Sequence, residues 1–161
     1  MIEEHSDFSE DKRHRYRLWK QWGESESNVC CFCLFNPLTG DSFAKDPTLV
    51  RCEQFARSWG CDGVMVVCLF SLATAFMKDI QLEGASKHND EVVVQEMKKA
   101  KIAVAAWGAF AEAIERGRGM MSRLKLEGVN VMCLQVVGGF VRTPLVVDPG
   151  TNPIPYEGAK A

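Results

Sequence analysis

The stretch VCCFCLFNPLTGDSFAKDPTLVRCEQFARSWGCDGVMVVCLF, residues 29–70, decides the fold. It begins and ends with two runs that are almost wholly apolar, residues 29–35 and 64–70. Between them, Asp46 and Pro47 mark the start of a helix, and apolar residues then recur at helical spacing as far as Trp59. Strands that are apolar on both faces and joined by a helix are typical of a buried parallel sheet.

The same alternation of apolar runs and helical spacing continues on both sides of this stretch. The further elements predicted are strands at residues 102–107 and 129–136 and helices at 10–22, 90–101 and 109–126, the last interrupted near Gly117 and Gly119. The pattern therefore predicts an α/β protein, a three-layer α/β/α sandwich with a mainly parallel, four-stranded central sheet. We expect residues 1–9 to be a flexible N-terminus, 10–150 a single domain, and 151–161 a C-terminal tail.

Composition places the chain among ordinary globular proteins. The net charge is −2, so no global positive field draws the chain onto nucleic-acid phosphates. No apolar run approaches the roughly twenty residues needed to span a bilayer, and residues 1–17 lack the apolar core of a secretory signal. The seven cysteines are an odd number and lie mostly in apolar runs, as expected for reduced thiols. We therefore expect a soluble, cytoplasmic protein that does not act on membranes.

The polar candidates for a binding site follow the predicted parallel strands. In open parallel sheets, ligands bind outside the carboxyl ends of the strands. The ordinary alternative is that Asn, Asp, Gly and Pro at these positions only build turns. Arg51, one helical turn beyond Thr48, is expected to pair with Asp41 or Asp46, to meet a ligand anion, or to face solvent. The ligand-binding candidates are Pro37, Thr39, Asp41, Thr48, Arg51, Asn89, Asp90, Trp107, Gly108, Gly139, Arg142 and Thr143.

Other motifs favour neither a metal nor a cofactor. Cys30 and Cys33 are spaced as in a C-x-x-C motif, but residues three apart on a strand point to opposite faces and cannot grip one ion. The three histidines have no partner at metal-ligand spacing, and no phosphate-binding or dinucleotide fingerprint occurs. The sequence therefore predicts no metal site, no cofactor and no disulfide between Cys30 and Cys33.

The chain resembles the uncharacterised bacterial and phage family called domain of unknown function 1643. The resemblance covers nearly the whole chain, in order and in spacing, and the family has no assigned activity to carry over. The residues that carry it are Arg15-Tyr16-Arg17-Leu18-Trp19, Trp22-Gly23, Leu34-Phe35-Asn36-Pro37, Thr39, Asp46-Pro47-Thr48, Arg51-Cys52, Phe55-Ala56, Trp59-Gly60, Leu69-Phe70, Lys78-Asp79, Asn89-Asp90 and Ala106-Trp107-Gly108.

A weaker resemblance is to uracil-DNA glycosylases of the mismatch-specific kind. It rests on a strand that ends in Asn36-Pro37, on the helix that follows, and on a late loop at residues 138–144. These enzymes hold a flipped base and a water near the Asn-Pro turn. The resemblance implies a glycosylase-like fold, with Asn36 positioning a water and the late loop contacting the substrate. Asn36 and Asp46 are accordingly the catalytic candidates.

Three departures from the first family bear on catalysis. Cys68 stands where the family usually has Asn, Ala73 where it has Arg, and Thr143 where it has His. The loss of these polar groups favours a divergent, phage-borne member that binds a nucleobase, nucleotide or nucleic-acid-related ligand, or a partner protein, without turnover. The alternative is a hydrolase that cleaves an N-glycosidic bond with a water held by Asn36. A third hypothesis is an accessory protein recognised only by another protein. The oligomeric state is left open.

Overall fold

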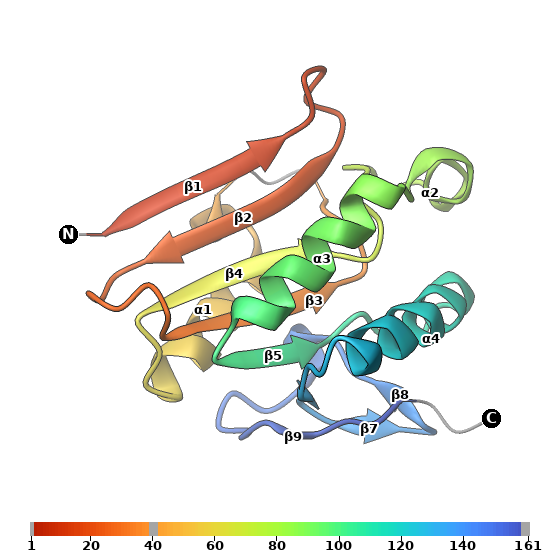
Figure 1. Cartoon of the computed structure of the whole chain (residues 1–161). Helices are drawn as coiled ribbons and strands as arrows, with labels where there is room; N and C mark the ends of the chain where they lie inside the picture. The colour runs from red at the N-terminus through yellow and green to blue at the C-terminus, as the bar shows by residue number, and fades with distance from the viewer. Residues whose placement is uncertain (1, 39–41, 159–161) are drawn as a thin grey trace.

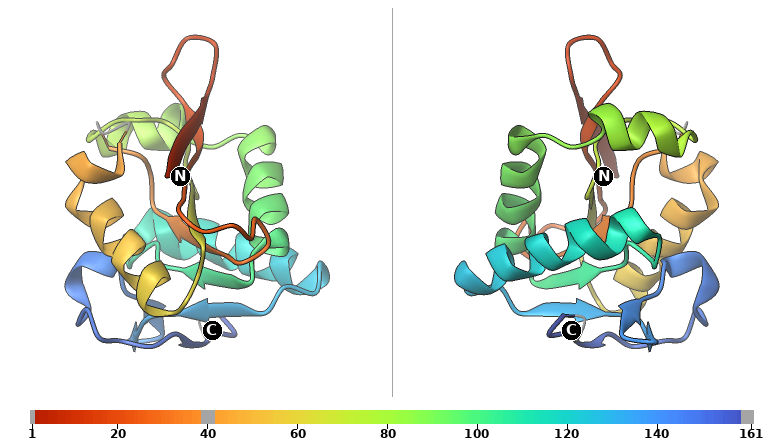
Figure 2. Two further views of the ribbon diagram at one scale, coloured as in Figure 1. Left: turned by 90° about the vertical axis from the view of Figure 1, so that its left-hand side faces the viewer. Right: turned by 90° about the vertical axis from the view of Figure 1, so that its right-hand side faces the viewer.

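The computed structural model describes residues 2–38 and 42–158, and its centre is a mixed sheet. Within the described residues the sheet has seven strands in the order β1-β2-β4-β3-β5-β6-β9. The helices lie on both of its faces, as Figure 2 shows with the sheet seen from its edges. The predicted α/β class and mainly parallel centre are confirmed, but the sheet has three more strands than the four predicted.

The four predicted strands form the parallel centre. β3 (Val29–Leu34) lies between β4 (Gly63–Cys68) and β5 (Ile102–Ala105), and β6 (Val131–Cys133) lies beyond β5. Each neighbouring pair is parallel. The order places the first and third of these strands side by side, so the chain leaves β3 and β5 toward opposite faces of the sheet.

The helices cover the two faces unequally (Figure 1). α1 (Pro47–Ser58) packs on one face, and α3 (Lys87–Lys99) and α4 (Ala111–Leu126) pack on the other. Their apolar sides define two core clusters, one on each face. Cys30 belongs to the α1-side cluster and Cys33 to the α3-side cluster, so the two thiols point to opposite faces as predicted.

Antiparallel strands extend the sheet at both edges. β1 (Glu3–Phe8) pairs with β2 (Arg15–Gln21), which pairs with β4. The predicted helix at residues 10–22 is therefore wrong, and the segment expected as a flexible N-terminus contains β1. At the other edge β9 (Ile154–Pro155), within the expected tail, pairs with β6. The connection after β6 forms a small hairpin of β7 (Val136–Val137) and β8 (Phe140–Val141). The fourth predicted strand, residues 129–136, therefore ends earlier than expected, and its last residue belongs to β7.

Three helical details differ from the sequence-based expectation. The connection after β4, predicted as a polar link, contains α2 (Met77–Glu83). α3 begins before the predicted residue 90, because the Ser86 side chain accepts a bond from the amide of Asn89 and caps the helix. α4 runs without interruption through its two glycines. Two short 3-10 helices, η1 (Phe43–Lys45) and η2 (Pro144–Val146), complete the fold.

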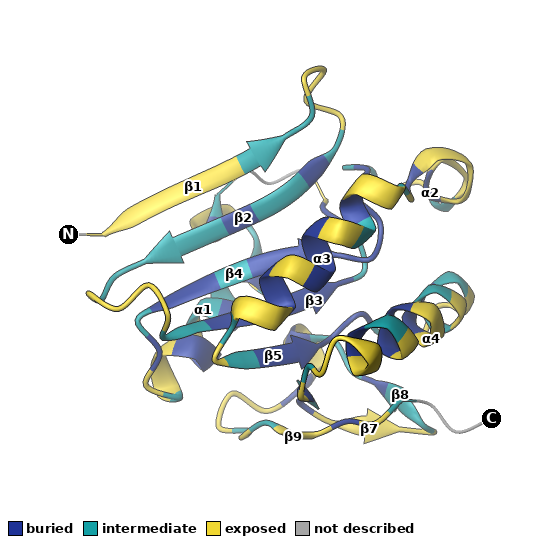
Figure 3. Cartoon of the chain, viewed as in Figure 1, coloured by how far each residue is buried: buried dark blue, intermediate teal, exposed yellow. Residues whose placement is uncertain are grey.

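Burial follows from this arrangement, as Figure 3 shows by colour. The central strands are buried along most of their length, whereas β1 is largely exposed. None of the helices in residues 2–38 and 42–158 has the length and apolar character that crossing a membrane requires.

Candidate functional site

The edge at which the four parallel strands end is the place where a ligand site is expected. In a doubly wound sheet, neighbouring strands whose connections go to opposite faces leave a crevice between their carboxyl ends. Here that point lies between β3 and β5. The residues that follow these strands, Phe35-Asn36 and Trp107-Gly108, come from segments far apart in the sequence. We call the carboxyl ends of β3, β4, β5 and β6, with the loops that follow them, the carboxyl edge.

Asn36 holds the carboxyl edge together. Its side-chain amide donates to the carbonyl oxygens of Leu72 at 3.2 Å and Thr74 at 2.7 Å, and also to that of Pro37 at 2.9 Å. These bonds tie the loop after β3 to the loop after β4. The amide nitrogen is therefore occupied, whereas the side-chain carbonyl oxygen of Asn36 accepts no hydrogen bond from the described residues.

The start of α1 is organised by Asp46. Its carboxylate accepts a hydrogen bond from the amide of Thr48 at 2.8 Å, with Pro47 at the first helical position, as predicted. Arg51 does not pair with Asp46. Its guanidinium instead donates a hydrogen bond to the carbonyl oxygen of Val147 at 2.7 Å. That bond fixes the C-terminal segment against α1. The candidates Thr39 and Asp41 lie outside the described residues.

The loop after β8 reaches the end of β5. Gly108 has a positive φ of 81°, and a Cβ atom there would stand 3.1 Å from the methyl carbon of Thr143. Within residues 2–38 and 42–158, the half-buried side chain of Arg142 makes no hydrogen bond or ion pair, which leaves it free for an anion. Gly139, with φ of 87°, belongs to the turn of the β7–β8 hairpin and has an evident structural role.

The start of α3 contributes a polar cluster on the opposite side of the edge. Asn89 is fully buried, and its amide donates to the carbonyl oxygens of Cys68 at 2.8 Å and Leu69 at 3.3 Å. Asp90 accepts a charged hydrogen bond from Arg116 of α4 at 2.5 Å. The side-chain oxygen of Asn89 and the Nε of Arg116 have no partner among the described residues. Unpaired buried polar atoms are costly, and two of the three among the described residues lie in this cluster, the third being the side-chain oxygen of Asn28.

An aromatic cluster lies beside these polar groups. The ring of Phe35 is 5.2 Å from that of Phe70 and 5.3 Å from that of Phe110, measured between centroids. The guanidinium carbon of Arg116 lies 5.3 Å from the centre of the Phe70 ring. Phe110 is 61% exposed although it is a large apolar side chain. This combination offers a ligand the exposed face of one aromatic ring, with an ion pair beside the cluster.

Sequence reasoning missed the aromatic cluster and Arg116. The available signal was an aromatic residue at the end of two predicted strands, at positions 35 and 70, and another shortly after a third, at position 110. Trp107, which was predicted to contact the ligand, is instead buried against α4, where a Cβ on Gly117 would stand 2.7 Å from its indole nitrogen.

Two of the residues that depart from the first family lie next to the edge. Cys68 is buried at the end of β4, and its pKa is raised to about 11 because burial disfavours the thiolate more than Arg15 favours it. At neutral pH Cys68 is therefore a neutral thiol and no nucleophile. Ala73 lies in the segment between β4 and α2, and its amide donates to the carbonyl oxygen of Arg13.

No group of three or more His, Cys, Asp or Glu side chains that could hold a metal ion occurs in the described ranges. All seven cysteines are buried free thiols. The groups described at the carboxyl edge form hydrogen bonds, the Asp90–Arg116 ion pair and aromatic contacts.

Comparison with known proteins identifies the family. No curated protein and no solved structure is significantly similar to the chain. The family model described as "Protein of unknown function (DUF1643)" matches residues 15–144, which include β2, the four parallel strands, all four α-helices and the loop as far as Thr143. Because the match covers far more than half of the chain, the protein belongs to this family, as the residue pattern indicated.

Proposed function

We propose that the protein binds a nucleobase or nucleotide at the carboxyl edge and releases it unchanged. The observation that carries this proposal is the aromatic cluster, in which the exposed ring of Phe110 packs against Phe35 where β3 and β5 diverge. Every base has a π-face, and stacking on an aromatic side chain contributes about 1–3 kcal/mol per base. An exposed phenylalanine at the usual ligand position of a doubly wound sheet supplies such a face.

Polar groups around the ring suit the rest of the ligand. The Asp90–Arg116 pair presents acceptors and donors of the kind that recognise the edge of a base. Arg142 and Thr143, at the end of β8, supply a cation and a hydroxyl for a phosphate or a sugar. The placement of Thr143 against Gly108 brings the late loop to the end of β5.

The chemistry of the edge favours binding over hydrolysis. A water-activating group needs free hydrogen-bonding capacity and a titratable neighbour. The carbonyl oxygen of Asn36 can accept from a water, but Cys68 is a neutral thiol and Thr143 takes the place of a histidine, so neither supplies a titratable neighbour. We therefore assign Asn36 the role of holding the loops around the ligand.

A binding screen tests the proposal. Bases, nucleosides and nucleotides are titrated by calorimetry, and each sample is then analysed by chromatography for products. We expect one class to bind and to be recovered intact. Phe110→Ala should weaken binding by about 1–3 kcal/mol, the contribution of one stacking contact. The matched control is Leu126→Ala, which truncates a side chain that is 89% exposed at the far end of α4.

Two results would contradict the proposal. One is the absence of binding by every base, nucleoside and nucleotide. The other is steady formation of product that Asn36→Ala abolishes, because loss of turnover by orders of magnitude is the signature of a catalytic group.

A further inference from the structure

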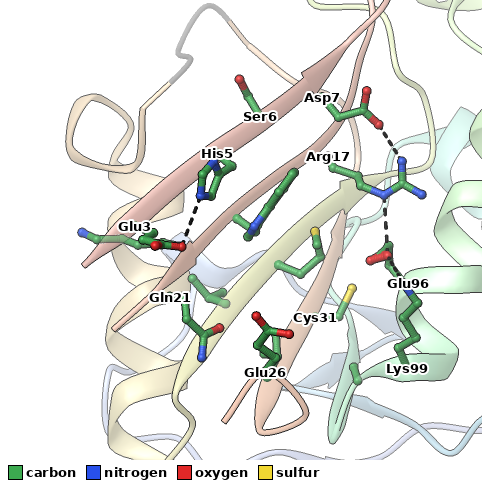
Figure 4. A pocket seen from close by; sticks show the side chains of 16 residues that line it. Glu3, His5, Ser6, Asp7, Arg17, Gln21, Glu26, Cys31, Glu96 and Lys99 are labelled. Carbon is green, nitrogen blue, oxygen red and sulfur yellow. Dashed lines mark hydrogen bonds and ion pairs between the residues drawn. The ribbon is translucent and has the colours of Figure 1, made fainter. Parts of the chain in front are cut away.

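A second site is found in a groove on the α3-side face of the sheet, away from the carboxyl edge. The groove has a volume of about 770 Å³, within the range of roughly 300–1,000 Å³ that is typical of small-molecule sites. Its floor is formed by β2, β3 and β4, one wall by β1, and the other by the last turns of α3. Figure 4 shows the side chains of β1 facing those of α3 across it.

The floor of the groove is apolar and centred on Trp19. Trp19, Met65 and Cys31 are direct neighbours on β2, β4 and β3, so they share one face of the sheet. α3 covers Cys31 but leaves Trp19 half-buried. The ring of His5 on β1 lies 5.3 Å from that of Trp19. Trp19 is half-buried and lines the groove, so the part of its indole that the His5 ring leaves uncovered can contact a ligand.

One end of the groove is closed by a satisfied ion network. Arg17 contacts Asp7 at 2.5 Å and Glu96 at 3.5 Å, and Glu96 also contacts Lys99 at 3.3 Å. Glu96 is buried, and these two contacts pair its carboxylate with Arg17 and Lys99. Both cations that face the groove are therefore already paired, and Lys20, which also borders it, bonds to Glu53 of α1. None of them is left to attract an anion.

The other end of the groove carries excess negative charge. Glu3 contacts only the ring of His5, at 3.5 Å, and Glu26 makes no hydrogen bond or ion pair within the described residues. Of the side chains that line the groove, four carboxylates (Glu3, Asp7, Glu26 and Glu96) stand against three cations (Arg17, Lys20 and Lys99), and Lys20 is neutralised by Glu53 outside the groove. An indole face attracts cations through its quadrupole, and Trp is the best of the aromatic side chains in this respect. Both the floor and the open end therefore select for positive charge.

From this geometry we propose that the groove binds a small organic cation, a protonated amine or guanidinium on an aliphatic stem. The cation lies against the indole of Trp19 and the carboxylates of Glu3 and Glu26, and the stem extends over Met65. The site shares no residue with the carboxyl edge, so the proposal stands or falls independently of the proposed function.

Three four-carbon probes test the charge selection by calorimetry. Putrescine should bind, whereas butanediol, which has a similar stem without charge, and succinate, which carries the opposite charge, should not. Binding of putrescine should weaken as salt is added, because exposed charges are screened. No binding of putrescine at about 10 mM, a very weak affinity, or equal binding of butanediol, overturns the proposal. The proposal is also overturned if a peptide that contains lysine binds and putrescine does not.

Substitutions locate the site. Glu3→Gln combined with Glu26→Gln should weaken putrescine binding about fivefold, because both side chains are exposed and each contact is worth little. Trp19→Leu should weaken it by about tenfold through loss of the cation–π contact. The control is Glu115→Gln, the same charge change at an exposed position on α4, which should leave affinity unaltered. Unchanged affinity in the Glu3/Glu26 variant, with its thermal stability intact, overturns the assignment even if Trp19→Leu fails to fold.

Discussion

At the scale of single residues, the two glycines of α4 have opposite requirements. A Cβ on Gly117 would stand 2.7 Å from the buried indole of Trp107, whereas a Cβ on Gly119 would meet nothing within 4 Å. Gly117→Ala should therefore destabilise the protein by about 1–3 kcal/mol through overpacking. Gly119→Ala should stabilise it by up to about 1 kcal/mol, because alanine is the better helix former. Denaturant unfolding of both variants checks this, and equal effects would show that Trp107 does not require Gly117.

The same glycines show what sequence reasoning misses at this scale. Gly117 and Gly119 led us to predict an interrupted helix, because glycine is unfavourable in a helix interior. The helix is continuous, and close packing against Trp107 explains Gly117. At the carboxyl edge, polar residues after each strand were predictable from their position. The aromatic cluster was not, because Phe35 and Phe70 extend apolar runs and resemble the ends of buried strands. Contact with Arg116 depends on tertiary packing that no local pattern reveals.

At the scale of elements, Glu53 joins α1 to the antiparallel extension of the sheet. Its carboxylate, which is mostly buried, contacts Lys20 of β2 at 2.8 Å and Arg57 at 2.9 Å. Burial raises the pKa of Glu53, but the bonds to Lys20 and Arg57 outweigh burial and lower it below the usual value. A lowered pKa means stability that is present above the unfolded pKa and lost as the pH falls through the folded one.

Glu53→Gln should therefore lower the free energy of unfolding by about 1 kcal/mol at neutral pH. The difference from the unmodified protein should shrink below about pH 4, where the carboxylate of the unfolded chain takes up a proton. Urea unfolding across this range provides the measurement. Glu91→Gln is the control, because Glu91 has a similar ion pair, with Arg123, but a fully solvated carboxylate. A difference that stays constant with pH would count against the ion pair as its source.

How well elements were predicted depended on their neighbours. The strands of the parallel centre are apolar on both faces, so their sequence admits one interpretation. In and just after β2, Leu18, Trp19 and Trp22 fit the spacing of a helix, whereas Tyr16, Leu18 and Trp22 also fit the alternation of a strand. The segment forms a strand because it pairs with β1 and β4. A local sequence pattern contains no information about such long-range pairing.

At the scale of the whole molecule, the seven thiols report on the integrity of both core clusters. All are buried, and burial raises the pKa of six of them, whereas a bond from the Cys30 thiol lowers that of Cys61. In mildly alkaline buffer we expect a thiol reagent to modify Cys61 first and the other six only as the protein unfolds. Titration before and after denaturation checks this, with Cys61→Ser as the control. Rapid modification of several thiols in the native protein would be incompatible with the two clusters.

The place of β4 in the sheet has a consequence for the order in which the chain can fold during synthesis. β4 lies between β2 and β3, although both precede it in the sequence. A nascent chain that ends before residue 63 can form the β1–β2 hairpin, but that hairpin has no neighbour to join, and β3 has no partner on either side. Such unpaired edges are prone to aggregation. Translation through residue 68 is thus the earliest moment at which the N-terminal part of the sheet becomes continuous.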